Sequence, residues 1–280
     1  MVRVRYSFGS RHTGRIENID KQKEKLPDIV KKVVRVSDIV LEVLDARFIG
    51  EMRNLELERL VEKRGKKLIY VLNKADLVDY KKINRQFSSS FRPRVFVSCK
   101  KRFGSRELRE RIKIEASRVE LSNKRERVQV GVVGYPNSGK SSLINFLTGK
   151  NSAKTSKQAG FTRGMQKIRL SEGIVLLDTP GVIPAGEYST SKRERFSQNA
   201  KVGARTYSDV KYPEEVVDYI MKDNSGVISD FYGVEFEGDV DEFIEKLGQK
   251  KGFLRKGGKV DVDRTSRFIL RDWQKGDIRI

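Results

Sequence analysis

Short apolar runs alternate along the first two thirds of the chain with segments in which apolar residues recur every three or four positions. The runs predict buried strands, and the longer period predicts helices that bury one face. The expected strands are residues 39–44, 67–72, 94–97, 128–133 and 174–177. The expected helices are residues 27–36, 52–63, 105–118 and 142–147. This alternation is typical of an α/β fold with a mostly parallel sheet.

The pattern changes from about Tyr188 onward, where helices with polar connections follow one another. Helices are expected at residues 192–200, 213–221, 239–247 and 263–274. The last of these is expected to bury Phe268, Ile269 and Trp273. Residues 188–280 therefore form a second, smaller and helical domain in this interpretation.

The expected strand 128–133 runs into residues 134–141, GYPNSGKS, which match the pattern G-x-x-x-x-G-K-[ST] of a phosphate-binding loop. Glycines let successive backbone N–H groups turn inward around phosphates. Lys140 would reach the outer phosphates, Ser141 would offer its hydroxyl to Mg²⁺, and the next helix would direct its positive end at the anion. The other expected contacts of this loop are Asn137, Ser138, Gly139 and Ser142. A simple glycine turn is the alternative, which the flanking strand and helix disfavour.

The strand at 174–177 ends in Asp178-Thr-Pro-Gly181, the D-x-x-G box of nucleotide-sensing switches. Asp178 would hold Mg²⁺ through water, and the Gly181 amide would sense the γ-phosphate. Residues 151–164 between the two boxes are rich in Ser, Thr and Gly, as expected for a switch loop. Thr162 is the candidate to complete the Mg²⁺ shell with Ser141 and Asp178, and Thr155 is the alternative.

Two upstream segments have the residues needed to recognise a guanine base. The strand 67–72 delivers Asn73-Lys74-Ala-Asp76, an N-K-x-D box, at its carboxyl end, where open α/β sheets bind ligands. The Asp76 carboxylate can accept from both the ring N–H and the amine of guanine, a donor pair that adenine lacks. Lys74 would lie along the base. The strand 94–97 is followed by an S-A-K-like box, Ser98, Cys99 and Lys100, in which cysteine replaces alanine.

The guanine box precedes the phosphate loop, which reverses the usual order, and no second N-K-x-D follows Gly181. The sequence is therefore interpreted as a circularly permuted GTPase, with residues 120–127 joining what would otherwise be the two termini. From about Asp38 onward the chain resembles the YlqF/RbgA-type family of permuted GTPases. The resemblance rests on these boxes, on residues 44–47 (LDAR), and on residues 253–261 leading into 267–273.

The resemblance implies a P-loop GTPase fold at residues 16–187 that binds GTP and GDP with Mg²⁺ and hydrolyses GTP. It also implies a role in assembly of the large ribosomal subunit, with the C-terminal domain docking on ribosomal RNA and possible contacts to ribosomal proteins. Related GTPases bind a potassium ion at the position of Asn137, so potassium stimulation is a hypothesis. Family members use an N-terminal histidine to position water, which points to His12, the only histidine. A solvent-exposed histidine in a polar arm is the alternative.

The residue after the D-x-x-G box is Val182, where many GTPases have the glutamine that orients the attacking water. Valine can neither donate nor accept a hydrogen bond. Intrinsic hydrolysis is therefore expected to be slow and to depend on a group from a partner. Asp45 and Arg47 follow a strand end, and an ion pair or a helix cap is the expected role for them.

The net charge of +21 and a pI of about 10.0 favour a polyanionic partner such as RNA, although an acidic membrane or solubility would also account for them. One cysteine excludes an internal disulfide and fits a reducing compartment. No apolar run approaches a membrane span. Residues 1–15 share their composition with mitochondrial transit peptides, but their strand-like period favours a basic arm of a cytoplasmic protein. A monomer is the default expectation.

The last helix carries a basic face, preceded by a basic loop. The cations of this surface are Lys250, Lys251, Arg255, Lys256, Lys259, Arg264, Arg267 and Arg271. A solvated face is the alternative to contact with RNA phosphates. Three functions therefore compete: a GTP-dependent ribosome assembly factor, an RNA-binding module that holds GTP structurally, and a signalling GTPase that acts on proteins.

Overall fold

A computed structural model describes residues 27–86, 91–121, 126–149, 166–181 and 192–279. These residues form a sheet of six strands in the order β3-β2-β1-β4-β6-β5. The strands are β1 (Ile39–Asp45), β2 (Lys67–Asn73), β3 (Arg94–Phe96), β4 (Val128–Gly134), β5 (Gln166–Ser171) and β6 (Ile174–Asp178). Every neighbouring pair is parallel except β5 and β6, which are antiparallel. The predicted α/β fold with a mostly parallel sheet is confirmed.

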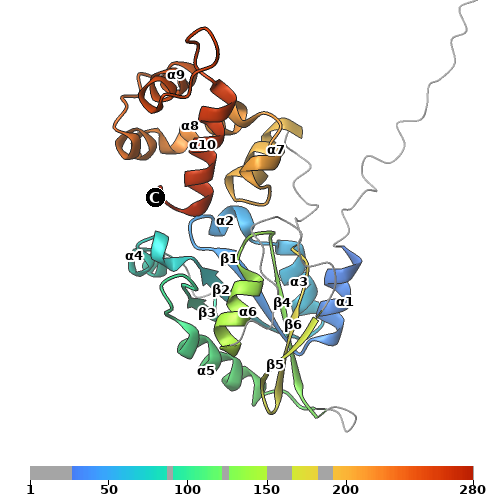
Figure 1. Cartoon of the computed structure of the whole chain (residues 1–280). Helices are drawn as coiled ribbons and strands as arrows, with labels where there is room; N and C mark the ends of the chain where they lie inside the picture. Colours follow the sequence, from blue (N-terminus) through green and yellow to red (C-terminus); the bar gives the residue numbers. More distant parts are fainter. Residues whose placement is uncertain (1–26, 87–90, 122–125, 150–165, 182–191, 280) are drawn as a thin grey trace, which may run out of the picture.

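Helices cover both faces of this sheet (Figure 1). Helices α1 (Asp28–Val36) and α3 (Leu55–Lys63) lie on one face, and α5 (Ser105–Ala116) and α6 (Lys140–Thr148) lie on the other. The short helices α2 (Ile49–Met52) and α4 (Tyr80–Gln86) follow the carboxyl ends of β1 and β2. Alternate residues of β1 serve the two faces, as the two-residue period of a strand requires. Leu41 packs in the cluster with α5 and α6, whereas Val40 packs with α1 and α3. Because β1 is buried on both sides, it appears in the sequence as a continuous apolar run.

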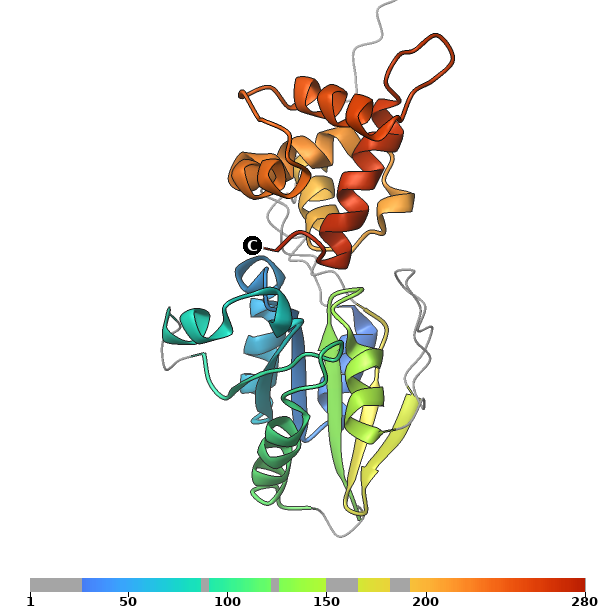
Figure 2. The ribbon, with the colours of Figure 1, turned by 60° about the vertical axis from the view of Figure 1, so that its left-hand side comes forward.

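The helical C-terminal part contains α7 (Lys192–Lys201), α8 (Pro213–Tyr232), α9 (Val240–Lys251) and α10 (Val262–Lys275). Figure 2 shows it stacked against one end of the sheet domain. Trp273 of α10 is fully buried, and its indole donates to the Lys201 carbonyl oxygen at 3.0 Å. Its ring also lies 5.9 Å from that of Phe48, and both belong to a single hydrophobic cluster. The two parts of the molecule therefore share a hydrophobic core.

Several elements differ from the sequence-based expectations. The helix expected at 52–63 begins only at Leu55, as α3, because the Asn54 side chain caps α3 by accepting from the Leu57 N–H at 2.9 Å, and Met52 instead ends α2. Helix α8 continues beyond residue 221 to Tyr232, through a kink at Asn224. Phe268 is only partly buried, whereas Ile269 and Trp273 are buried as expected.

Strand β5 and helix α4 were not anticipated, because neither has the expected apolar signature. In β5 only Ile168 is buried, and the strand lies at the sheet edge with charged neighbours in sequence. The predicted boundary between residues 187 and 188 lies outside the described residues and stays a prediction. Within the described ranges, no helix combines the length and apolarity needed to cross a bilayer.

Candidate nucleotide site

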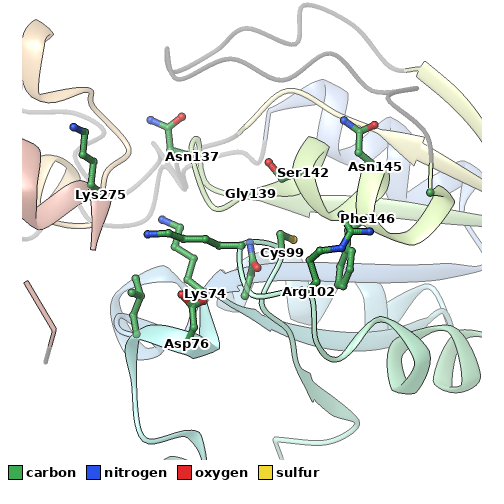
Figure 3. Close-up of a pocket in the computed structure, with 14 residues that line it drawn as sticks. Lys74, Asp76, Cys99, Arg102, Asn137, Gly139, Ser142, Asn145, Phe146 and Lys275 are labelled. Atoms are coloured by element: carbon green, nitrogen blue, oxygen red, sulfur yellow. The ribbon is translucent and has the colours of Figure 1, made fainter. Parts of the chain in front are cut away.

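The guanine box and the phosphate loop meet at one edge of the sheet. Strands β1 and β4 are parallel neighbours, and β2 lies on the other side of β1, so all three end at the same edge. A pocket of about 580 Å³ opens there. It is lined by predicted residues from both segments, namely Asn73, Lys74, Asp76, Cys99, Lys100, Asn137, Gly139 and Ser142 (Figure 3). The structure therefore brings together the two halves of the predicted site.

A direct hydrogen bond joins the two halves. The Asn73 side-chain amide donates to the Ser138 carbonyl oxygen at 2.8 Å. Gly139 follows with φ +96°, and a Cβ there would overlap the Asn73 amide nitrogen. Both features require glycine at 139, which allows the base box to brace the phosphate loop. Asn73 Oδ1 is buried and has no hydrogen-bond partner among the described residues.

The Asp76 carboxylate is oriented by the S-A-K-like box. Ser98 Oγ donates to Asp76 Oδ1 at 2.5 Å and accepts from the Lys101 N–H at 2.9 Å. One oxygen of Asp76 is therefore fixed, and the side chain lines the pocket. Burial and the nearby Asp76 raise the pKa of the Cys99 thiol to about 12. Cys99 is thus a neutral, unreactive side chain, consistent with its substitution for alanine.

Lys140 begins α6 and is held inside the phosphate loop. Its Nζ donates to the Gly134 carbonyl oxygen at 3.0 Å and to the Tyr135 carbonyl oxygen at 2.6 Å. Burial lowers the pKa of Lys140 to about 8, although the charge of Asp178 opposes this shift. The two loop carbonyl oxygens therefore hold the ammonium group at a position from which it can approach an anion.

Ser141 and Asp178 form the part of the predicted Mg²⁺ site that the structure describes. Ser141 Oγ donates to Asp178 Oδ2 at 3.1 Å, while Asp178 Oδ1 is buried and has no hydrogen-bond partner in the described part of the chain. Burial raises the pKa of Asp178. The described ranges contain no cluster of three or more His, Cys, Asp or Glu that could hold a metal. One hydroxyl and one carboxylate oxygen fit Mg²⁺, which takes its remaining ligands from phosphates and water.

Gly181 lies directly against the phosphate loop. A Cβ at this position would approach Pro136 Cα to 2.5 Å and Lys140 Nζ to 3.1 Å. Only glycine allows the D-x-x-G backbone so close to the loop, which is the arrangement expected of a phosphate sensor. Four further candidates, Thr155, Thr162, Val182 and His12, lie outside the described residues, and their roles stay predictions.

Asp45 has a larger role than the sequence indicated. The expected ion pair with Arg47 is present at 2.9 Å, but Lys74 Nζ also lies 2.7 Å from Asp45 Oδ2. Burial would raise the pKa of Asp45, but the two cations hold it well below its usual range. Arg47 also donates to the Trp273 carbonyl oxygen at 2.8 Å. Asp45 therefore connects the guanine-box lysine to the end of α10.

The C-terminal domain also contacts the pocket, which the sequence did not reveal. Lys275, the last residue of α10, lines the pocket beside Leu77. Asn137 in the phosphate loop donates through Nδ2 to the Gly203 carbonyl oxygen at 2.9 Å. These contacts link residues that are far apart in sequence. The only sequence signal for them was the presence of polar residues at strand and helix ends.

Comparison with known proteins agrees with this geometry. Residues 129–242 match the family model described as 50S ribosome-binding GTPase. Over 258 residues the chain is 40% identical to an uncharacterized GTP-binding protein of Methanocaldococcus jannaschii, covering 92% of this chain and 67% of that protein. The chain belongs to the YlqF/RbgA-type family of circularly permuted GTPases.

Three further likenesses place this permuted GTPase among its relatives. It is 32% identical to nucleolar GTP-binding protein 2 of Yarrowia lipolytica, covering 92% of this chain and 50% of that protein. The chain therefore spans about half the length of this nucleolar relative. The GDP-bound structure of YlqF has a TM-score of 0.61 at 23% identity, over 89% of this chain and 95% of that one. A GNP-bound structure of YlqF from T. maritima gives the same TM-score at 22% identity, over 89% of this chain and 93% of that one. These matches confirm the permuted P-loop fold.

Proposed function

We propose that this permuted GTPase binds GTP and GDP with Mg²⁺, hydrolyses GTP, and acts as a switch factor in assembly of the large ribosomal subunit through ribosomal RNA. The observation that carries the nucleotide part is the 2.8 Å hydrogen bond from Asn73 to Ser138. It joins a guanine box and a phosphate loop, which lie far apart in sequence, around one pocket.

Each part of a nucleotide has a matching group in this proposal. Asp76 accepts from the guanine ring N–H and amine, and the backbone of Ser98–Lys100 meets the guanine carbonyl oxygen. The loop amides around Gly139 and the ammonium of Lys140 bind the phosphates. Ser141, Asp178 and Thr162 hold Mg²⁺, which neutralises charge on the phosphate oxygens. Gly181 senses the γ-phosphate.

Hydrolysis in this proposal depends on a group that positions water, because Val182 cannot. His12 is the candidate, brought to the site on a ribosomal particle, so the intrinsic rate is slow and the particle stimulates it. Potassium stimulation is part of the same proposal. It rests on Asn137, whose Oδ1 is the atom left for a cation because Nδ2 donates to Gly203.

The ribosomal role is supported by the family model, whose description names the 50S ribosome, and by the nucleolar relatives. The net charge of +21 supports a nucleic-acid partner. Possible contacts with ribosomal proteins, a cytoplasmic location and a monomeric state stay predictions. A signalling GTPase, or an RNA-binding module that retains GTP without turnover, is the alternative function.

The rate of GTP hydrolysis with and without purified large ribosomal subunits separates these functions. The proposal expects slow turnover alone and a clear increase with large subunits, but not with small subunits. Equal rates under all conditions would favour a signalling GTPase. Tight GTP binding without turnover in any mixture would favour the RNA-binding module.

Nucleotide affinity is expected to fall as the pH rises above about 8. Burial lowers the pKa of Lys140 to about 8 in the protein alone, and bound phosphates would raise it by attracting the charged form. Binding therefore takes up a proton above that pH, and the affinity for GDP decreases by up to about tenfold per pH unit. Calorimetric titration with GDP in two buffers of different ionisation enthalpy measures this uptake directly. Binding with no proton uptake at about pH 8.5 would contradict this role of Lys140.

A further inference from the structure

The structure divides the basic residues of the C-terminal domain into two groups. Eight cations of this domain are predicted to contact RNA, and four of them already bind carbonyl or carboxylate groups within the domain. Lys250 donates to the carbonyl oxygens of Tyr232 and Gly233 at 3.0 and 2.7 Å, where it caps α8. The other three form ion pairs, Arg255 with Asp261, Arg267 with Asp263 and Arg271 with Asp272. These four cations stabilise the fold and have less capacity for a ligand.

The other four cations are Lys251, Lys256, Lys259 and Arg264. All four side chains are exposed, and none has an acidic partner within 4.0 Å in the described part of the chain. Lys251 is the last residue of α9, Lys256 and Lys259 lie on the loop between α9 and α10, and Arg264 lies in the first turn of α10. Figure 2 shows this loop projecting from the domain. The available positive charge is therefore concentrated on one projection.

Backbone hydrogen bonds give this loop a defined shape. Leu254 and Val260 form a β-bridge, the Arg255 N–H donates to the Lys259 carbonyl oxygen at 2.7 Å, and the Asp261 N–H donates to the Phe253 carbonyl oxygen at 2.8 Å. Two glycines with φ +91° and +77°, at positions 257 and 258, close the turn at its tip. The loop is thus a small hairpin with a defined backbone, and Lys256 and Lys259 flank its tip.

Aromatic rings continue from the base of this hairpin. Phe253 contacts Phe268 edge to face at 5.2 Å, and Phe268 lies 5.9 Å from Tyr232, which in turn contacts Phe231 at 4.8 Å. The Arg264 guanidinium covers the Phe253 ring at 4.4 Å. Phe231 and Leu254 are 45% and 48% exposed. Exposed positive charge and the partly exposed rings of Phe231, Phe253 and Phe268 therefore lie side by side, whereas Tyr232 is itself buried.

We propose that this surface, called here the α9–α10 hairpin surface (residues 251–264), binds unpaired bases of RNA. It extends the RNA-binding part of the proposed function and rests on it. A-form duplexes keep their bases stacked inside, so their phosphates would use the lysines but not the aromatic rings or the guanidinium plane. An unpaired base can stack on Arg264 or displace it from Phe253, while Lys256 and Lys259 contact the neighbouring phosphates.

The test measures binding of the full chain, loaded with GDP, to two RNAs of equal phosphate number. One is a hairpin with a large unpaired loop, and the other is a fully paired duplex. The wild type is expected to prefer the looped RNA. Phe253→Leu, which keeps the apolar volume but removes the ring face, is expected to weaken looped-RNA binding about tenfold and duplex binding little. Lys113→Gln, at an exposed lysine on α5 in the other domain, is the matched control and should bind like the wild type.

Salt dependence separates stacking from charge. Arg264→Gln and Lys256→Gln are each expected to reduce the slope of log affinity against log salt by about 0.7, whereas Phe253→Leu leaves the slope unchanged. GDP affinity and the thermal unfolding midpoint, unchanged from the wild type, verify that each variant is folded. Equal binding of all variants and the control to looped RNA would overturn the inference. So would a preference for duplex, or equally good competition by poly-glutamate. Absence of RNA binding with intact GTP binding would instead remove the RNA part of the proposed function itself.

Discussion

Replacing Asp76 with asparagine is expected to change the base preference of the pocket from guanine to xanthine. The Asp76 carboxylate, fixed by Ser98 at 2.5 Å, presents acceptors to the ring N–H and the amine of guanine. Asparagine presents one acceptor and one donor, and its donor matches the carbonyl group that xanthine carries in place of that amine. Loss of two charge-assisted hydrogen bonds should weaken GTP binding by at least about 100-fold. Competition titrations with GTP and xanthosine triphosphate measure both changes.

Asp79→Asn is the matched control for this substitution. Asp79 is exposed three residues further along and accepts from the Lys81 and Lys82 N–H groups at the start of α4. Asparagine caps a helix about as well as aspartate, so this variant should bind GTP like the wild type. Wild-type GTP affinity in the Asp76→Asn protein would mean that the pocket does not read guanine through Asp76.

The meeting of the guanine box and the phosphate loop at one pocket was predictable from sequence, because the residues of both follow strands with strong signals. Strands β1, β2 and β4 are almost wholly buried and appear as continuous apolar runs. Residues directly after such runs must lie at the same sheet edge when the strands are parallel, which places Asp76 near Gly139. Strand β5 could not be predicted in this way. It lies at the sheet edge and buries Ile168, so its sequence has no continuous apolar run.

The contacts between the sheet domain and the helical domain could not be predicted in the same way. The hydrogen bond from Arg47 to Trp273 spans 226 positions, and that from Asn137 to Gly203 spans 66. Both end on backbone carbonyl oxygens, which every residue possesses, so no side-chain pattern marks the acceptor. The basic surface shows a related limit. The sequence shows a charge such as Lys250, but only the structure shows that it donates to the Tyr232 and Gly233 carbonyl oxygens.

Replacing Asp45 with asparagine is expected to destabilise the protein strongly. Asp45 is fully buried between Lys74 and Arg47, and the side chain of Arg47 is only 2% exposed. Removing the carboxylate leaves two cations without their counter-charge, which typically costs about 3–5 kcal/mol in the free energy of unfolding. Urea unfolding near neutral pH measures this loss. GTP affinity should also fall, because Lys74 loses the group that holds it beside the base.

Asp263→Asn serves as the control, because it breaks an ion pair that is partly exposed. Its partner Arg267 is 29% exposed and Asp263 is 47% exposed, so the expected cost is about 0.2–1 kcal/mol. The stability that Asp45 contributes is present above its unfolded pKa of 3.8 and is lost as the pH falls through its lower folded value. The difference between the wild type and Asp45→Asn should therefore shrink in acid. Equal stability of the two variants near neutral pH would show that Asp45 is not the charge that joins the guanine box to α10.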